Sequence, residues 1–414
     1  MSGVQINEQL LAESPCFASA QRQQELREFF RFDRRRVILG EGALATLGAE
    51  CRRLGAGRVL LVRDPGVAAL EPAVRQALAG ERVEVVGVYD GVVPNPSVAS
   101  VDDCARHVGQ ADCQAVVALG GGSTIDTAKT ALCAATAGQS IAAFFGFDLF
   151  AEPARWPLLA LPTTAGTGSE ASRVSIVADE TGKKAVFSDH LVPKVALVDP
   201  QLTHGMPPAL TATTGLDALG HALECTASKK SNALGDAVAR EAVRAGCPHL
   251  ERAVLRGGED REARYQMARC SLLAGLLLSP INTGAAHALG YGIEKVSAAK
   301  GRAVPHGAAV CLVLPQVMRH NAPEVADKYY YMAGVAGLDL GGRSREEGVE
   351  LAARWVDDLR RRHTPYGSLS TSGLGEGDIP RMVEIAMTTR RLLDPNPVEV
   401  TAEDAARIYR SVLN

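Results

Sequence analysis

In the stretch Ala115-Val-Val-Ala-Leu-Gly-Gly-Gly-Ser-Thr124, a short apolar run passes directly into a glycine-rich turn and the start of a helix, which is typical of a strand-turn-helix unit. Comparable apolar runs, each closed by turn-forming residues, lie at residues 58–64, 83–89 and 157–161. Helix-like stretches separate them. Strands that alternate with helices predict a doubly wound parallel sheet, so the first half of the chain is expected to be an α/β domain.

The second half of the chain has a different character. Strand-like runs become scarce after about residue 207, and long segments rich in Ala, Leu, Arg and Glu follow at 213–228, 232–255 and 260–278. These segments predict an all-helical domain. A glycine and two prolines cluster at Gly205-Met-Pro-Pro208, which favours a boundary there. The expected parts are an N-terminal extension over 1–31, an α/β domain over 32–206 and a helical domain over 207–414.

Composition excludes several classes of protein. The 414 residues are 46% hydrophobic and 22% charged, with a formal net charge of −3, which argues against a disordered chain and against a nucleic-acid partner. The N-terminus lacks the pattern of a secretory signal, and the most apolar stretch, 270–281, is too short to span a bilayer, so no membrane partner is expected. The nine cysteines form no CxxC pair, which favours a reduced, cytoplasmic protein.

Two turns could bind phosphate groups. Gly120-Gly-Gly-Ser-Thr124 follows a strand and opens a helix, where backbone N–H groups and the helix dipole favour an anion. Pro162-Thr-Thr-Ala-Gly-Thr-Gly-Ser-Glu170 is a second turn of the same kind. Each turn alone is also compatible with a simple helix cap. Two such turns at strand ends of one sheet favour a dinucleotide, and Asp64, which ends another strand, favours NAD(H) over NADP(H), since its carboxylate would repel a 2′-phosphate.

The helical half contains residues suited to a metal ion. Asp217 and His221 are spaced i, i+4 and therefore share one helix face. His287 and His306 lie in two further segments rich in small residues. Any one of these histidines alone is more typical of a core or capping residue. One carboxylate and three imidazoles together form a ligand set for a divalent ion such as Fe²⁺ or Zn²⁺.

In combination these motifs resemble those of the iron-dependent, or group III, alcohol dehydrogenase family. The motifs occur in the family's order, from about Phe32 to the C-terminus: Asp90-Gly-Val-Val-Pro-Asn-Pro96, Gly120-Gly-Gly-Ser-Thr-Ile-Asp126, Leu161-Pro-Thr-Thr-Ala-Gly-Thr-Gly-Ser-Glu170, Gly215-Leu-Asp-Ala-Leu-Gly-His-Ala-Leu-Glu224, Pro305-His-Gly307 and Asp394-Pro-Asn-Pro-Val-Glu-Val-Thr401.

The resemblance implies a dinucleotide-binding α/β domain followed by a helical, metal-binding catalytic domain. It places the metal on Asp217, His221, His287 and His306. It places NAD(P) on a set of loop residues: Asp64, Asn95, Gly121, Gly122, Ser123, Asp126, Thr163, Thr164, Thr167 and Lys183. We also expect a homodimer or a larger homo-oligomer.

The chain departs from the family pattern near the metal ligands. Many members carry a second histidine one turn after the third ligand, and here that position is Tyr291, which remains a candidate catalytic residue. The segment that follows it adds Lys295, Lys300 and Arg302 close to the metal ligands in sequence. A solvated basic loop is one interpretation. The other is that one of these cations faces the site and favours a substrate with an anionic group.

The predicted function is a metal-dependent NAD(P)(H) oxidoreductase that interconverts a small alcohol and its aldehyde or ketone. Two alternative enzymes stay open: a hydroxyacid–oxoacid transhydrogenase of the same family, and a lyase that resembles dehydroquinate synthase and also uses NAD and a metal. A non-catalytic ligand-binding protein is the third alternative, and the four intact metal positions argue against it.

Overall fold

The computed structural model describes residues 35–180 and 182–414, so the predicted N-terminal extension lies outside the described residues. The strands are β1 (Arg36–Leu39), β2 (Arg58–Arg63), β3 (Glu84–Tyr89), β4 (Ala115–Gly120), β5 (Gly146–Phe147), β6 (Leu158–Pro162), β7 (Val174–Asp179), β8 (Gly182–Phe187) and β9 (Val195–Val198).

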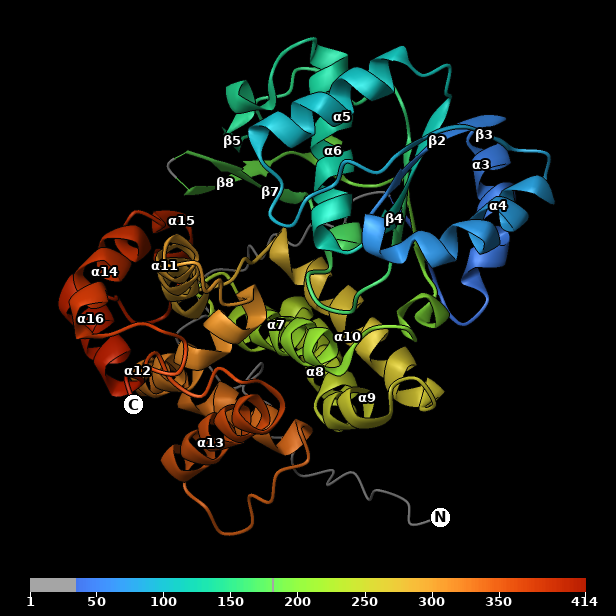
Figure 1. Ribbon diagram of the computed structural model, residues 1–414. Helices are drawn as coiled ribbons and strands as arrows, with labels where there is room; N and C mark the ends of the chain where they lie inside the picture. The colour runs from blue at the N-terminus through green and yellow to red at the C-terminus, as the bar shows by residue number, and fades with distance from the viewer. Residues whose placement is uncertain (1–34, 181) are drawn as a thin grey trace, which may run out of the picture. The chain divides into compact units, whose positions relative to one another are not determined.

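Helices connect the strands in the first half of the chain and make up most of the second half (Figure 1). The α-helices are α3 (Leu47–Arg53), α4 (Glu71–Ala79), α5 (Val98–Gln110), α6 (Gly122–Ala137), α7 (Pro208–Ala227), α8 (Ala233–Gly246), α9 (Leu250–Arg256), α10 (Arg261–Leu278), α11 (Ala285–Ala299), α12 (His306–Val335), α13 (Arg345–His363), α14 (Ile379–Met387), α15 (Arg390–Leu393) and α16 (Ala402–Ser411). The 3-10 helices are η2 (Ala43–Thr46), η3 (Pro65–Leu70), η4 (Ile141–Phe144), η5 (Ser169–Ala171), η6 (Asp189–Leu191), η7 (Pro200–Thr203) and η8 (Glu376–Asp378).

The main sheet has six strands in the order β1-β9-β6-β4-β2-β3, and every pairing is parallel. The predicted doubly wound parallel sheet is therefore confirmed. The chain builds outward from β2 to β3 and then returns to the other side of β2 with β4, so the topological switch point lies between β2 and β4. Ligands of such sheets bind outside the strand ends at this point. Asp64 follows β2 and the glycine-rich turn follows β4.

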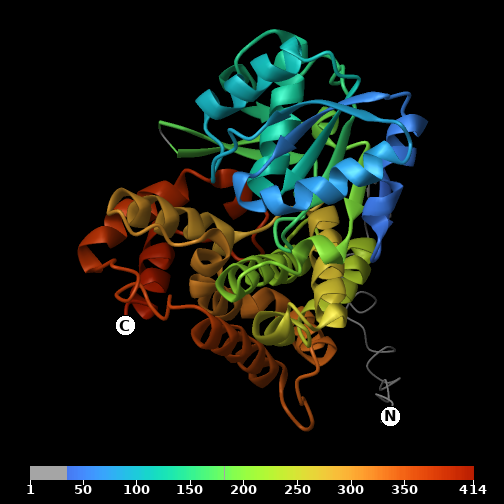
Figure 2. The ribbon, with the colours of Figure 1, turned by 45° about the vertical axis from the view of Figure 1, so that its right-hand side comes forward.

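The strands of the main sheet are apolar on both faces because helices cover both faces. Along β4, Val116 and Ala118 belong to one buried cluster, which includes residues of α5 and α6. Ala115, Val117 and Leu119 belong to a second cluster, which includes residues of α3 and α4. Figures 1 and 2 show these two helix pairs on opposite faces of the strands.

A second sheet was not predicted. Its order is β5-β8-β7, and β7 pairs with β8 as an antiparallel hairpin. A parallel bridge between Ser97 and Ala178 joins the hairpin to the start of α5. The backbone N–H of Ala178 also donates to the carbonyl of Pro96 at 2.7 Å. The hairpin therefore lies beside the predicted cofactor segment that contains Asn95.

Contacts divide the chain into two compact units, each formed by more than one segment. Among the described residues, the sheet unit contains those from 35 to 219 and from 249 to 279, and the helical unit contains those from 220 to 248 and from 280 to 414. Helix α7 passes from one unit into the other at Leu219. The last strand, β9, ends at Val198 and α7 begins at Pro208, so the change from strands to helices falls near residue 206. That this point is also the boundary between two domains stays a prediction.

The second half is helical as predicted, with a break inside one of the predicted helical segments. The segment 232–255 forms two helices, since α8 ends at Gly246 and α9 begins at Leu250. Pro248 lies in the break, and since it has no backbone N–H it cannot continue the hydrogen-bond pattern of α8. Across the described residues, no helix has both the length and the apolar character needed to cross a bilayer.

Helix α10 and the turn after β6 approach each other with almost no space between their backbones. Gly168 has φ of +60°, and a Cβ built on it would lie 2.4 Å from the Cα of Gly275 in α10. A Cβ built on Gly275 would lie 2.4 Å from the carbonyl oxygen of Gly168. Neither position accepts a side chain, so the two glycines fix the turn against the helix.

We predict that Gly275→Ala lowers the free energy of unfolding of the protein by about 1–3 kcal/mol, because the added methyl group must displace backbone atoms. Urea denaturation followed by circular dichroism measures the change. Gly205→Ala is the matched control, because a Cβ at Gly205 meets no atom of the described residues within 4 Å. Equal effects of the two substitutions would contradict the close contact.

Candidate metal and cofactor site

Three of the predicted metal ligands come together on two helices. Asp217 and His221 lie one turn apart on α7, and His287 lies in the first turn of α11. One possible ligand atom from each residue lies within 4.8 Å of the others. The three residues are only 3%, 5% and 3% exposed, so this donor set is shielded from bulk water.

His306 lies next to this cluster, although it is outside the group of atoms within 4.8 Å. It is the first residue of α12 and is half-buried. The centroid of its ring lies 5.3 Å from that of His287, with the two rings close to perpendicular. The rings of His221 and His287 are stacked, with their centroids 4.8 Å apart. All four predicted ligands are therefore neighbours in the structure.

Two glutamates that we did not predict orient two of these histidines. Glu224, on α7, accepts a hydrogen bond from Nδ1 of His287. Glu294, on α11, accepts one from Nδ1 of His306 at 2.5 Å. A carboxylate at Nδ1 holds the proton on that nitrogen and directs Nε2 of the same ring toward the metal position.

The donor set fits a divalent transition metal. Neutral imidazoles and a carboxylate are ligands of Fe²⁺ and Zn²⁺, and carboxylates on the outer nitrogens are the usual support for histidine ligands. The oxygens of Asp217 and the Nε2 atoms of His287 and His306 are the donors that this arrangement offers. His221 supplies the third imidazole.

Backbone contacts fix the helix that carries His287. The second oxygen of Glu224 accepts from the backbone N–H of Ala286 at 2.7 Å, so one carboxylate holds both the start of α11 and its histidine. The Asn396 side chain accepts from the N–H of Ala285 at 3.3 Å and pairs with Asn321 on α12 through two hydrogen bonds. The Asp394-Pro-Asn-Pro397 segment thus caps α11 and joins it to α12.

The two predicted cofactor turns lie side by side because they follow neighbouring strands. Gly120 of β4 is paired with Pro162 of β6, and the N–H of Thr163 donates to the carbonyl of Gly120 at 3.0 Å. A Cβ on Gly121 would lie 3.2 Å from the side chain of Thr164. The absence of side chains after β4 therefore allows the second turn to approach.

The next glycine of the turn makes a still closer contact. A Cβ on Gly122 would lie 2.6 Å from the side chain of Thr167. The hydroxyl of Thr167 accepts a hydrogen bond from the N–H of Ser169 at 3.3 Å. The hydroxyl of Ser123 accepts from the N–H of Asn95, which has a left-handed φ of 54°. Three predicted cofactor segments thus meet at the start of α6.

Asp126 has a structural role within this cluster. One of its oxygens accepts from the Ser169 hydroxyl at 2.5 Å, and the other accepts from the N–H of Ile176 at 2.9 Å. These bonds tie α6 to the second turn and to β7. Lys183, another predicted cofactor residue, lies on β8 opposite Ala178 of β7.

A buried lysine forms hydrogen bonds with the same turn and with the strand that follows it. Lys129 is 1% exposed, and its ammonium donates to the carbonyls of Ser169 at 2.9 Å and Val174 at 2.7 Å. Glu170 is 2% exposed, and burial raises its pKa to about 7. Burial also lowers the pKa of Lys129 to about 8. Two ionisable groups, Lys129 and Glu170, are therefore shielded from water at this turn.

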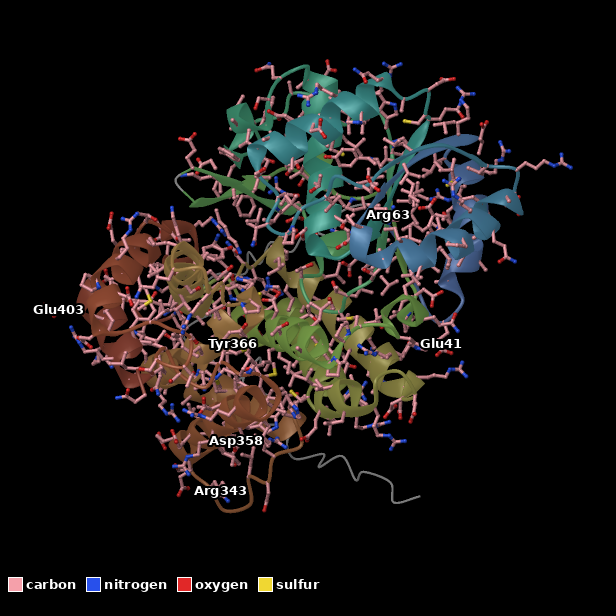
Figure 3. The ribbon with its side chains drawn as sticks, viewed as in Figure 1. Glu41, Arg63, Arg343, Asp358, Tyr366 and Glu403 are labelled. Atoms are coloured by element: carbon pink, nitrogen blue, oxygen red, sulfur yellow. The ribbon has the colours of Figure 1, made fainter. Side chains whose placement is uncertain are left out.

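Asp64 ends β2 as predicted and caps η3. One carboxylate oxygen accepts from the N–H of Gly66 at 2.7 Å, and within the described residues the other accepts no hydrogen bond. The preceding residue, Arg63, is labelled in Figure 3 and is 8% exposed. Its guanidinium forms ion pairs with Glu71 at 3.1 Å and Asp90 at 3.2 Å. Its positive charge is therefore already balanced beside Asp64.

The second cofactor turn also contacts the helix that carries the first metal ligands. A Cβ on Gly166 would lie 2.7 Å from the side chain of Thr214 and 2.9 Å from its carbonyl oxygen. Thr214 precedes Asp217 by three residues on α7 and belongs, like the turn, to the sheet unit. Within this unit, the predicted cofactor turn thus contacts the helical turn that leads to Asp217.

The cations near the metal ligands have different environments. Lys300 is exposed and pairs with Asp378 at 2.5 Å, and Arg302 is exposed as well. Lys295 is half-buried on α11. Tyr291, also half-buried on α11, accepts a hydrogen bond from Arg391 of α15 at 3.2 Å. Sequence reasoning missed Arg391, which lies far from the other site residues in the chain.

The sheet and the residue cluster together define a class of protein: a dinucleotide-binding α/β fold combined with helices that bring a carboxylate and histidines together, as in metal-dependent dehydrogenases. Two family models match the chain, "iron-containing alcohol dehydrogenase" over residues 34–200 and "Fe-containing alcohol dehydrogenase family, C-terminal" over residues 211–413. The chain belongs to the iron-containing alcohol dehydrogenase family. The predicted family is confirmed, and the lyase hypothesis loses its basis.

Individual relatives match over nearly the whole chain. Choline dehydrogenase of Bacillus subtilis (strain 168) is 33% identical over 398 residues, which cover 94% of this chain and 97% of that protein. The structure of 1,3-propanediol oxidoreductase has a TM-score of 0.87 at 31% identity and covers 94% of this chain and 100% of its own. Sulfoacetaldehyde reductase from Bifidobacterium kashiwanohense, solved in complex with NAD⁺, has a TM-score of 0.82 at 29% identity, with coverages of 93% and 98%.

We predict that Glu224→Ala weakens the affinity for Fe²⁺ or Zn²⁺ by about 10–100-fold, because His287 loses the carboxylate that orients its ring. Competition with a chelator of known affinity measures the change. Glu403→Ala is the control, since Glu403 is exposed on α16, as Figure 3 shows. An unchanged metal affinity in Glu224→Ala would contradict the orienting role.

We predict that Glu170 makes stability depend on pH. A carboxyl group whose pKa is raised in the native state holds its proton more tightly there, so its contribution is complete below about pH 4.5 and is lost as the pH rises through about 7. Relative to the parent, Glu170→Gln should therefore gain at least about 1.4 kcal/mol in unfolding free energy between pH 5 and pH 8. Denaturation at both pH values measures this gain. Glu84→Gln, at an exposed position, should show none.

Proposed function

We propose that this protein is a metal-dependent NAD(H) oxidoreductase that interconverts a small alcohol and its aldehyde or ketone. The observation that carries the proposal is the buried group of Asp217, His221 and His287, with His306 beside it and two carboxylates on the outer imidazole nitrogens. Membership of the iron-containing alcohol dehydrogenase family supports it.

Asp217, His221, His287 and His306 would hold the metal, which when bound would supply Lewis acidity toward the substrate oxygen. The protein supplies the rest by alignment. Glu224 and Glu294 keep His287 and His306 in one tautomer and one orientation. Burial of Asp217 and His221 excludes water from one side. The hydroxyl of Tyr291 accepts a hydrogen bond from Arg391, and as a phenol it is a candidate proton donor to a substrate oxygen.

Residues at the strand ends would hold the dinucleotide, which supplies the hydride. The small turn at Gly121 and Gly122 gives its phosphates access to the backbone N–H groups at the start of α6. Asn95, Ser123, Thr163, Thr164 and Thr167 line the meeting point of the segments. Asp126, with both oxygens bonded inside the protein, contributes by holding the second turn. Lys183, which lies on β8 opposite Ala178, is a further candidate for contact with the cofactor.

NAD(H) is the preferred cofactor in this proposal. The second oxygen of Asp64 is available to the adenosine ribose, and a 2′-phosphate at that place would meet a carboxylate. The charge of Arg63 is shared with Glu71 and Asp90, so it offers a 2′-phosphate little compensation. The native metal in this proposal is Fe²⁺ or Zn²⁺, since both accept this donor set.

The eight cysteines among the described residues are free thiols, which supports a reducing, cytoplasmic setting.

Association into a homodimer or larger homo-oligomer is a further prediction, which analytical ultracentrifugation can test. A small-molecule substrate is the expected partner.

The test is NADH consumption by metal-loaded protein with a panel of aldehydes. We expect the activity to disappear after removal of the metal and to return with Fe²⁺ or Zn²⁺. His306→Ala should reduce the activity by orders of magnitude and leave the affinity for NADH unchanged. Full activity of metal-free protein would overturn the proposal. Turnover of a hydroxy acid with an oxo acid in the absence of added NADH would favour the transhydrogenase instead.

We predict that Asp64→Gly raises the ratio of kcat/KM for NADPH to that for NADH by about tenfold or more, because the repelling charge is lost. Steady-state kinetics with both cofactors measure the ratio. Asp112→Gly is a suitable control, since the Asp112 side chain is 86% exposed. A parent enzyme that already prefers NADPH would show that Asp64 does not select the cofactor.

A further inference from the structure

We infer that Arg391 and Tyr291 form an anion-binding element beside the metal ligands, so the substrate carries a carboxylate, sulfonate or phosphonate near its carbonyl group. This inference rests on the proposed function and assigns its substrate class to particular residues. It differs from the hypothesis that the sequence raised for Lys295, Lys300 and Arg302, because the cation comes from α15.

Tyr291 connects the metal ligands to the cation. It lies one turn after His287 on α11, and the centroid of its ring is 5.5 Å from that of His306. The Arg391 guanidinium donates to its hydroxyl at 3.2 Å, and Cζ of Arg391 lies 5.7 Å from the centre of the Tyr291 ring. Only one side chain therefore separates the guanidinium from a metal ligand, and all three residues belong to the helical unit.

This side of the metal ligands is the more open one. Asp217, His221 and His287 are buried, whereas His306, Tyr291 and Arg391 are each partly exposed. A substrate that brings its carbonyl oxygen to the metal position therefore has its remaining atoms on the side of Tyr291. A short substrate that extends past Tyr291 would bring its far end toward the guanidinium, which contacts the Tyr291 hydroxyl.

The charges of the site explain why an anionic substrate needs this cation. Asp217, Glu224 and Glu294 bring three carboxylates close together, and a divalent ion balances only two of them. Without a further cation, the site would repel a second anionic group. Arginine supplies a planar fork that binds carboxylate, sulfonate or phosphonate oxygens with two parallel hydrogen bonds.

The position of Arg391 is fixed through its backbone. Its carbonyl accepts from the side-chain amide of Asn282, which precedes α11. The neighbouring Arg390 pairs with Asp394 and is exposed. Lys300, the cation that follows α11, is exposed and bound to Asp378. Of these three cations, Arg391 is the one with a direct contact to Tyr291, beside the metal ligands.

The family does not by itself determine the charge of the substrate. By their names, similar proteins act on choline, which is a cation, on a neutral diol and on sulfoacetaldehyde, which is an anion. The substrate charge must therefore be inferred from the residues of this chain, and Arg391 favours an anion.

The experiment compares two anionic aldehydes, sulfoacetaldehyde and 4-oxobutanoate, with two neutral ones, propanal and pentanal. The parent should have a higher kcat/KM for the anionic pair. Arg391→Gln should reduce the anionic-to-neutral ratio by about tenfold or more, mainly through KM, and Arg391→Lys should restore part of it. Lys300→Gln, the matched control, should leave the ratio unchanged.

A binding measurement separates this inference from the proposed function. Calorimetry with ethanesulfonate, which has no carbonyl group, should show binding to the metal-loaded, NAD⁺-bound parent that weakens about tenfold or more in Arg391→Gln. A parent that prefers neutral aldehydes, an Arg391→Gln variant with unchanged ratio and affinity, or loss of the preference in Lys295→Gln alone would overturn the assignment. Failure to reduce any aldehyde, with anion binding intact, would instead overturn the proposed reaction.

Discussion

The constraint on which the rest of the site depends is that three imidazoles from three helices must present one nitrogen each to one point. Hydrogen bonds across helices meet this requirement. Glu224 on α7 holds His287 on α11, and Glu294 on α11 holds His306 at the start of α12. Each carboxylate is seven residues beyond a ligand on its own helix, so it lies on the ligand-bearing face and reaches the next helix. The same hydrogen bonds therefore join α7, α11 and α12 and orient the metal ligands.

The cofactor side depends on a different constraint, the absence of side-chain atoms. Gly121, Gly122 and Gly166 lie where any Cβ would meet a threonine of the facing segment. These contacts bring the ends of β4 and β6 together and hold the second turn on α7, three residues before Asp217. Buried Lys129 and partly buried Asp126 then fix that turn through hydrogen bonds to a carbonyl and a hydroxyl of Ser169. The glycines allow the turns to approach each other, and the hydrogen bonds of Lys129 and Asp126 fix the position of the second turn.

Sequence reasoning predicted the sheet and the neighbourhood of the four metal ligands, because apolar periodicity and i, i+4 spacing are local signals. It did not assign roles to Glu224 and Glu294, since a glutamate on a helix is usually solvated and its burial depends on a neighbouring helix. The i, i+4, i+7 pattern of Asp217, His221 and Glu224, repeated at His287, Tyr291 and Glu294, is the signal that indicates them. The contact between Arg391 and Tyr291 joins segments 100 residues apart, and no local pattern encodes it.

We propose that Asp217, His221, His287 and His306 bind one divalent metal ion together. X-ray absorption spectroscopy of the Fe²⁺- or Zn²⁺-loaded protein tests it most directly, because imidazole rings give a characteristic multiple-scattering signal. We expect one ion per chain with three imidazole nitrogens and carboxylate oxygen at about 2.0–2.2 Å, and one imidazole fewer in His306→Ala. A spectrum with sulfur ligands, or one that is identical in the parent and in His306→Ala, would contradict the claim.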